Sequence, residues 1–381
     1  MITPEKIILL TGNLVEDARA KALEEHINGK IFGYHVITIK EEQITNRLYS
    51  KWLNTALIYG IRHGINWLDN VEGVRKMQVK RLNKNRAKVN GKYKKQSQGS
   101  FRRINNVVNR FNAKAILCMN TNTLFLTLKA KEKFGFKAEV VGCLDSFTFD
   151  KKTTPLGADK YIVENNELKD ELVRNNVAKE KIIIKRFPIE KEVFIEETER
   201  ELRSLFDIDL KPTVLLNGGS IGDNKIVEIF KLLLEVEDRF NIIVYCGENE
   251  PLYQRFVRAK ESGNLKNVKL FTTVNNIEKL YKAVDCIVSI YDVSAIYKAK
   301  VLNKPIIVFA PKREVEEQDF KYLNKVGDAI YAKDSSDVVA KIFDVTNKNI
   351  VKTEKNVDEI RSSTIVASNY LIDLLSDKDK E

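Results

Sequence analysis

The chain has 381 residues, of which 43% are hydrophobic and 31% are charged, and its formal net charge is +11. This length exceeds what a single hydrophobic core comfortably serves, so it predicts two domains. No apolar run approaches the roughly 20 residues that a membrane-spanning helix needs, which excludes a helix that crosses the bilayer.

The amino terminus and the cysteines indicate the compartment. The opening residues, MITPEKIILLTGN, lead straight into a strand-like run without the basic leader and cleavage site of a secretory signal. Four cysteines lie in apolar runs without metal-type spacing, which is typical of small buried side chains in a reducing compartment. They are Cys118, Cys143, Cys246 and Cys286. We therefore expect a cytoplasmic protein.

The positive charge is concentrated between Arg75 and Lys131, a stretch without a single Asp or Glu. Such a field attracts phosphate, whether in anionic lipid or in nucleic acid. An ordinary solvated surface is the alternative interpretation. The residues from which we expect anionic-surface binding are Lys80, Arg81, Lys84, Lys94, Lys95, Arg102 and Arg103.

Strand-like and helical patterns alternate through the first half of the chain. The predicted strands cover 6–12, 35–40, 113–120, 137–145, 158–165 and 181–188. The predicted helices cover 15–27, 123–135 and 166–176, and a helix-rich basic insertion occupies 45–112. Strands separated by helices of about 10–15 residues indicate βαβ units and a parallel sheet.

After Pro188 the sequence turns acidic and irregular, and then a second series of the same kind begins. Its predicted strands cover 213–219, 240–247, 268–274, 285–291 and 304–311, and its predicted helices cover 223–236, 251–263, 277–284 and 294–303. We therefore predict two doubly wound α/β domains, over 1–190 and 191–355, that face a cleft. An amphipathic pattern predicts a C-terminal helix over 356–381 that packs back across the domains.

Five stretches occur in an order that carries a family resemblance. They are NAKAILCMNTNT with KAEVVGCLDSFTFD, GADKYIVENNELKDELVRNNVAKEKIIIKRFPIEKEVF, TVLLNGGSIG, VYCGENEPLYQRF, and KPIIVFAP with EEQDFKYLNKVGDAI. In this order the chain resembles GT-B glycosyltransferases, and more narrowly the monogalactosyldiacylglycerol synthase and processive diacylglycerol glucosyltransferase family, which is related to MurG. The resemblance implies two Rossmann-like domains, with the acceptor on the side of 1–190 and a nucleotide sugar bound by 191–355.

The resemblance places a UDP-sugar at the strand ends of the second domain. A diphosphate needs backbone amides and a close backbone approach, which glycines permit. For each residue alone, an ordinary loop or helix cap is the alternative. The expected donor-binding residues are Gly218, Gly219, Ser220, Gly247, Glu248, Asn249, Tyr291, Asp292, Ser294, Lys298, Glu316, Glu317, Gln318 and Asp319.

Three positions depart from the family pattern. Glu16 stands where the family has a His at a helix start, and it can act as a base or only complement the helix dipole. Lys298 replaces a Glu that binds ribose hydroxyls, and a lysine pairs instead with phosphate. Asp319 replaces an Asn, while Glu316 is retained. These changes favour a different donor, a different acceptor or an inactive relative.

The first hypothesis is an inverting, metal-independent glycosyltransferase that moves a hexose from a UDP-sugar to a lipid or glycolipid. No DxD-like acidic pair stands at a strand end, so we expect no metal, and no cofactor beyond the UDP-sugar co-substrate. Glu16 or Asp145 would accept the proton of the acceptor hydroxyl. The basic segment would hold the enzyme peripherally on the inner membrane face.

Two further hypotheses remain open. A phage-type, DNA-directed glycosyltransferase would use the basic segment to grip phosphates, although the sequence has no recognisable groove-reading module. A catalytically inactive GT-B-fold binding protein would explain the altered motifs. Neither the sugar, the acceptor nor the oligomeric state follows from the sequence.

Overall fold

The structure of the protein is a computed structural model, and it divides into two compact units that are described separately. The described residues up to 185 belong to unit 1 and those from 191 belong to unit 2. The described ranges are 5–11, 14–30, 34–44, 98–144, 146–150, 154–185, 191–218, 224–247, 249–263, 267–272, 274, 276–309 and 314–347.

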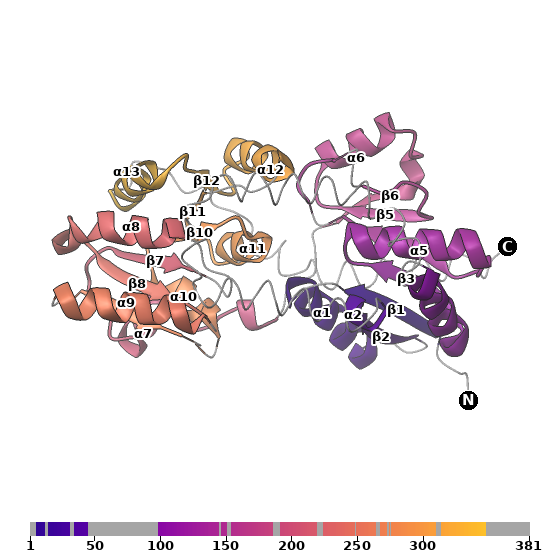
Figure 1. Ribbon diagram of the computed structural model, residues 1–381, viewed down its shortest axis with the longest axis horizontal. Helices are drawn as coiled ribbons and strands as arrows, with labels where there is room; N and C mark the ends of the chain where they lie inside the picture. Colours follow the sequence, from indigo (N-terminus) through magenta and orange to yellow (C-terminus); the bar gives the residue numbers. More distant parts are fainter. Residues whose placement is uncertain are drawn as a thin grey trace. The chain divides into compact units, whose positions relative to one another are not determined.

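Unit 1 contains a six-stranded parallel sheet with the order β2-β1-β3-β4-β5-β6 (Figure 1). Its strands are β1 (Glu5–Thr11), β2 (Tyr34–Lys40), β3 (Ala113–Cys118), β4 (Glu139–Cys143), β5 (Lys160–Val163) and β6 (Ile182–Ile184). Its helices are α1 (Leu14–Lys30), α2 (Glu41–Ile44), a helix over 98–111, α5 (Thr121–Phe134), α6 (Asn166–Arg174) and the short η2 (Lys179–Lys181).

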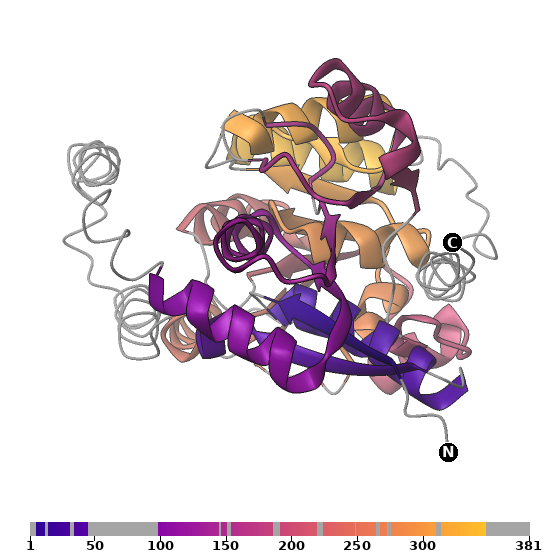
Figure 2. The same ribbon diagram turned by 90° about the vertical axis from the view of Figure 1, so that its right-hand side faces the viewer.

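Local signals explain where α5 begins and ends. Asn120 forms a capping box with Thr123, in which the Asn120 side chain accepts a hydrogen bond from the backbone N–H of Thr123 at 2.7 Å. Gly135 ends the helix in the left-handed conformation, with a φ of 66°. The helix over 98–111 lies against the same unit (Figure 2), and Ile104 and Val108 join its core.

Unit 2 contains a second six-stranded parallel sheet, with the order β12-β11-β10-β7-β8-β9. Its strands are β7 (Thr213–Asn217), β8 (Asn241–Tyr245), β9 (Val268–Phe271), β10 (Cys286–Ile290), β11 (Ile306–Phe309) and β12 (Ile330–Tyr331). Its helices are η3 (Lys191–Val193), α7 (Glu199–Leu205), α8 (Asn224–Leu234), η4 (Glu237–Arg239), α9 (Glu250–Gly263), α10 (Ile277–Ala283), α11 (Val293–Val301), α12 (Glu314–Lys325) and α13 (Ser335–Thr346).

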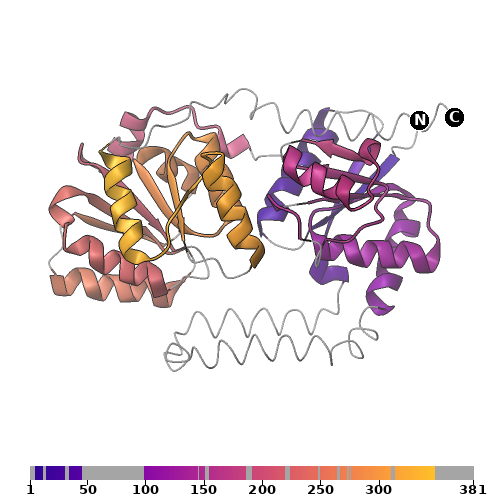
Figure 3. The ribbon, with the colours of Figure 1, turned by 90° about the horizontal axis from the view of Figure 1, so that it is seen from above.

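Helices flank the sheet of unit 2 on both faces (Figures 1 and 3). Apolar side chains of α8, α9 and α13, such as Phe230, Phe256 and Ile342, form one core with β7, β8 and β10. Phe230 and Phe256 meet edge to face, with ring centroids 4.9 Å apart. The connections through α10 and α11 run in the opposite direction along the sheet, so right-handed crossovers place them on the other face.

The predicted fold class is confirmed, because each unit is a doubly wound parallel α/β sheet. The four cysteines are buried, as expected, and burial raises the pKa of the Cys118 and Cys246 thiols to about 12. The segment after Pro188 is more regular than we expected. It contains α7, which starts at a capping box between Thr198 and Glu201. Most of the basic insertion and the region 356–381 lie outside the described residues.

Candidate functional site

The sheet of unit 2 reverses its strand order between β7 and β10. In open parallel sheets, ligands bind outside the carboxyl ends of the strands at such a point, because the connecting loops diverge there. Gly218 follows β7, and Tyr291 and Asp292 follow β10. The expected donor residues of these two loops therefore flank the reversal point of one sheet.

Gly218 occupies a position with no room for a side chain. Its N–H donates a hydrogen bond to the carbonyl oxygen of Tyr245 at 2.9 Å. A Cβ at this position would lie 2.9 Å from Cδ2 of Leu252 and 3.1 Å from the Tyr245 carbonyl oxygen. Glycine thus permits the tight contact between the end of β7, the end of β8 and the start of α9. Gly219 and Ser220 lie outside the described residues.

The turn after β8 shapes the start of α9. Gly247 adopts a left-handed φ of 55°, which glycine tolerates without strain. Asn249 is 3% exposed, and its Oδ1 accepts a hydrogen bond from the backbone N–H of Leu252 at 3.1 Å. Asn249 therefore acts as a helix cap, and its contact with a nucleotide stays a prediction. Glu248 lies outside the described residues.

Asp292 caps the first turn of α11. Its Oδ1 accepts hydrogen bonds from the backbone N–H groups of Ser294 at 2.8 Å and Ala295 at 3.4 Å. A carboxylate in this position complements the positive end of the helix dipole. A phosphate at this helix end would meet the negative Asp292 carboxylate as well as the backbone amides. The expected phosphate contact stays a prediction.

The four residues expected to bind sugar hydroxyls lie on helix α12, where two of them are buried and two are exposed. Glu316 and Asp319, three residues apart and hence on one helix face, are 8% and 2% exposed, whereas Glu317 and Gln318 are exposed. The hydroxyl of Tyr291 donates a hydrogen bond to Oδ2 of Asp319 at 2.5 Å. The structure thus joins one residue of the β10 loop to one residue of α12.

Lys298 forms an ion pair within unit 2. Its Nζ lies 2.5 Å from Oε1 of Glu278 on α10, and the two side chains are 19% and 9% exposed. The positive charge that the sequence suggested for a phosphate is therefore already matched by a carboxylate of the same unit. The sequence analysis overlooked Glu278, because the pattern IEKLYKAV around it predicts only an ordinary helix.

A buried polar network that the sequence analysis also missed lies beside the reversal point. The Nδ2 of Asn217, at the end of β7, donates to the hydroxyl of Tyr281 at 2.7 Å and to Oγ of Ser289 at 3.3 Å. Burial raises the pKa of Tyr281 well above its usual value, with smaller contributions from Asp292, Glu278 and Tyr245. Polar residues at the ends of apolar strands were the available signal: Asn217 closes TVLLN and Ser289 interrupts CIVSI.

Two residues of unit 1, Glu16 and Asp145, are expected on the acceptor side. Glu16 lies in the first turn of α1, and its side chain is outside what the structure describes, as is Asp145 after β4. Glu41 directly follows β2, and its Oε1 accepts a hydrogen bond from Nδ2 of Asn122 on α5 at 2.5 Å. The sequence analysis passed over Glu41, because a charged residue after a strand has no distinctive local pattern.

Only two of the residues expected to bind an anionic surface are described. Arg102 is exposed on the helix over 98–111. Arg103 is half-buried, and its Nε donates a hydrogen bond to the carbonyl oxygen of Ile44, which ties this helix to α2. The other five lie outside the described residues: Lys80, Arg81, Lys84, Lys94 and Lys95.

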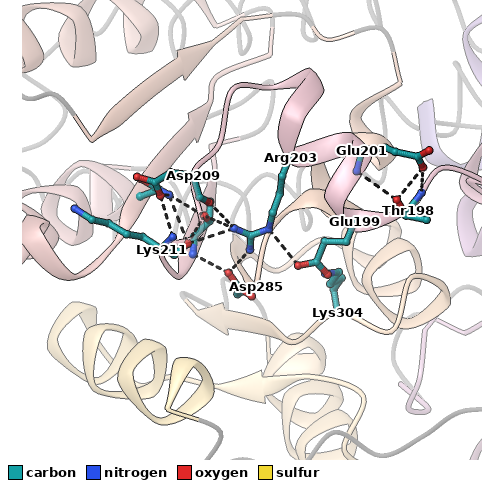
Figure 4. Close-up of polar contacts among 10 residues, drawn as sticks. Thr198, Glu199, Glu201, Arg203, Asp209, Lys211, Asp285 and Lys304 are labelled. Atoms are coloured by element: carbon teal, nitrogen blue, oxygen red, sulfur yellow. Dashed lines mark hydrogen bonds and ion pairs between the residues drawn. The ribbon is translucent and has the colours of Figure 1, made fainter.

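A pocket of about 1400 Å³ lies on unit 2 at the amino-terminal edge of the sheet, opposite to the candidate donor site. Arg203 lies in its lining, where its guanidinium contacts the Asp285 carboxylate at 2.5 Å and the carbonyl oxygens of Asp209 and Lys211 at 3.0 and 3.3 Å (Figure 4). Nε also donates to Glu199 at 3.2 Å. These contacts satisfy the guanidinium internally, so we assign it a structural role.

In the described ranges, no group of three or more His, Cys, Asp and Glu side chains is arranged to hold a metal ion. No helix among the described residues has the length and apolar character needed to cross a bilayer.

The comparisons with known proteins identify the fold. The chain has a TM-score of 0.64 and 12% identity to the UDP-GlcNAc 2-epimerase from Neisseria meningitidis bound to UDP-GlcNAc, with 97% of this chain and 100% of that chain covered. Its TM-score to MurG of Acinetobacter baumannii is 0.56, with 13% identity over 98% of this chain and 100% of that chain. The protein therefore has the GT-B fold, as predicted.

Sequence similarity is more specific. The chain is 25% identical over 240 residues to a processive diacylglycerol β-glucosyltransferase of Bacillus thuringiensis. This alignment covers 59% of the present chain. The alignment spans 58% of the length of that relative. The resemblance to this group of enzymes is confirmed. No protein-family model matches the chain.

Proposed function

We propose that the chain is a glycosyltransferase that moves a hexose from a UDP-sugar to a lipid or glycolipid at the cytoplasmic membrane face. The observation that carries this proposal is the 25% identity over 240 residues with a processive diacylglycerol β-glucosyltransferase. The fold alone does not select transfer over epimerisation, because a UDP-GlcNAc 2-epimerase has a similar fold.

In this proposal the UDP-sugar binds at the carboxyl edge of unit 2, across the ends of β7 and β10. Gly218 allows the backbone to approach the diphosphate, and backbone amides stabilise the charge that develops on the leaving UDP. The hydroxyl of Tyr291, held by the buried Asp319 carboxylate, binds a sugar hydroxyl in this proposal. The reaction is inverting and requires no metal ion.

The acceptor binds at the carboxyl edge of unit 1, and a carboxylate of this edge accepts the proton of its hydroxyl. Arg102 and the basic residues before it attract anionic lipid, which raises the local concentration of a membrane-borne acceptor. Each of the two units thus supplies the site of one substrate.

Product analysis tests the function directly. Purified protein is incubated with UDP-glucose, UDP-galactose or UDP-GlcNAc and dioctanoylglycerol in mixed micelles, without added metal. We expect a glycolipid and an equal amount of UDP. Formation of an isomeric nucleotide sugar without glycolipid would instead indicate an epimerase, and transfer to duplex DNA would indicate the nucleic-acid acceptor. Binding of UDP without turnover would support an inactive relative.

A site variant tests the place of the donor. Tyr291→Phe removes one hydrogen bond at the proposed sugar site, which corresponds to about 1 kcal/mol, or a roughly fivefold higher Kd for the UDP-sugar. Tyr331→Phe is the matched control, because the Tyr331 ring stacks on Phe320 in the same aromatic group. Equal Kd values in both variants would move the donor away from Tyr291.

A further inference from the structure

The carboxylate of Glu41 lies at the carboxyl edge of the sheet of unit 1. It accepts a hydrogen bond from a residue that follows a different strand of this sheet. Glu41 follows the last residue of β2, while its hydrogen-bond partner Asn122 lies in the first turn of α5, after β3. The strand order is β2-β1-β3, so this bond passes over the carboxyl end of β1. This is the point where unit 1 reverses its strand order and where a parallel sheet binds its ligand.

The surroundings of Glu41 suit a proton acceptor. Burial raises the pKa of this carboxyl, against the opposing effect of hydrogen bonds from Asn122 and Asn120. A carboxylate is a more effective general base as its pKa rises toward the working pH. The side chain is only partly buried, so an incoming hydroxyl has access to it.

Among the described residues, two neutral side-chain amides donate hydrogen bonds to Glu41. Asn120 and Asn122 face it from α5, and Thr11, fully buried, ends the neighbouring strand β1. Lys40 precedes it and is exposed on β2, and Glu16 lies in the first turn of the helix that follows β1. The side-chain amides can orient the carboxylate without neutralising its charge.

We propose that Glu41 is the catalytic base that accepts the proton of the acceptor hydroxyl, with Asn122 as its positioning residue. This inference rests on the proposed transferase function. In the step, the acceptor oxygen forms a bond to the anomeric carbon, and the bond from that carbon to the diphosphate oxygen breaks. The electron pair of the broken bond leaves with UDP, and the hydroxyl proton passes to the Glu41 carboxylate. The products are the glycolipid, UDP and a proton later released to water.

The test measures kcat and KM for transfer from the active UDP-hexose to dioctanoylglycerol between pH 5 and 9. Glu41→Gln should lower kcat by about 100-fold or more, with the KM for the UDP-sugar unchanged, since a general base contributes about 10²- to 10⁴-fold. We expect kcat of the wild type to rise with pH, and this rise should vanish in Glu41→Gln. Asn122→Ala should shift that rise to higher pH, because it removes a hydrogen bond that favours the charged carboxylate.

Glu24→Gln is the matched control. Its carboxylate is also hydrogen-bonded within unit 1, to Oγ1 of Thr38 at 2.6 Å, and we expect wild-type kcat. If Glu41→Gln does not fold, Glu41→Asp and Asn122→Ala carry the test through their pH profiles. Retention of kcat within about fivefold in Glu41→Gln, or an unshifted profile in Asn122→Ala, would overturn the roles assigned here while leaving the transferase function standing. Absence of transfer by the wild type from every UDP-hexose would overturn both.

Discussion

The ammonium group of Lys298 and the carboxylate of Glu278 lie 2.5 Å apart and are largely shielded from water. Two neighbouring helices, α10 and α11, are joined by this contact next to the end of β10. The pair presents little net charge to a ligand, because each group compensates the other. Lys298 is therefore better understood as part of a matched pair than as an isolated phosphate-binding cation.

We expect Lys298→Met to lower the free energy of unfolding by roughly 3 kcal/mol, because it leaves a buried carboxylate without its counter-charge. The reversed pair, Lys298→Glu with Glu278→Lys, should recover part of this loss. Urea unfolding of the single and double charge-reversal variants gives the coupling energy, which we expect to be about 1–3 kcal/mol. Strictly additive effects would show that the two groups do not interact in solution.

Gly218→Ala should destabilise the protein by about 1–3 kcal/mol, because the new methyl group would overlap the Leu252 side chain and press on the Tyr245 carbonyl. Gly99→Ala is the control. The atoms nearest to a Cβ there belong to the Arg103 guanidinium, at 3.5 Å, which is ordinary contact. Urea unfolding should separate the two variants. An unchanged free energy of unfolding in Gly218→Ala would mean that the end of β7 is less tightly packed than the structure shows.

Arg203→Met should also cost roughly 3 kcal/mol, since it removes the counter-charge of the Asp285 carboxylate and one donor from each of two backbone carbonyls (Figure 4). Arg203→Lys should restore only a small part of the lost free energy of unfolding, because an ammonium group lacks the planar fork of donors. Arg200→Met, on an exposed position of the same helix, serves as the control. Thermal unfolding followed by circular dichroism measures all three. Equal transitions for Arg203→Met and Arg200→Met would contradict the structural role of Arg203.

Low pH should lower the free energy of unfolding of the protein, because Glu199 becomes protonated. Burial alone would raise the pKa of this carboxyl, but hydrogen bonds and charge from Lys304 and Arg203 outweigh it and lower the pKa below 4.5. A lowered folded-state pKa contributes stability above the unfolded value, and this stability is lost as the pH falls through the folded value.

The urea midpoint of Glu199→Gln should therefore lie below that of the wild type by a constant amount at pH 5 to 7. The difference should shrink below pH 4.5, the ordinary pKa of a glutamate. Glu196→Gln, at an exposed position nearby, provides a control for the loss of a negative charge. A difference that persists unchanged at pH 3 would argue against the ion pairs of Glu199.

Several features of the fold followed from local patterns. The apolar runs around Val140 and Ile287 predicted buried strands, and Gly135 predicted the end of α5. Parallel sheets followed from the alternation of strands with helices. Such features depend on residues within a few positions of one another, so the sequence displays them directly. The GT-B resemblance rested on the order of these same elements.

The partners of the polar side chains depended on the tertiary structure. Glu41 meets Asn122 across 81 positions of the chain, and Asn217 meets Ser289 across 72. These contacts exist because the strand orders place β1 between β2 and β3, and β7 beside β10. Local sequence patterns do not predict strand order, because the packing of each whole unit determines that order. The sequence thus determined two doubly wound sheets with buried strands, whereas the tertiary structure decided which charged and polar groups meet at their edges.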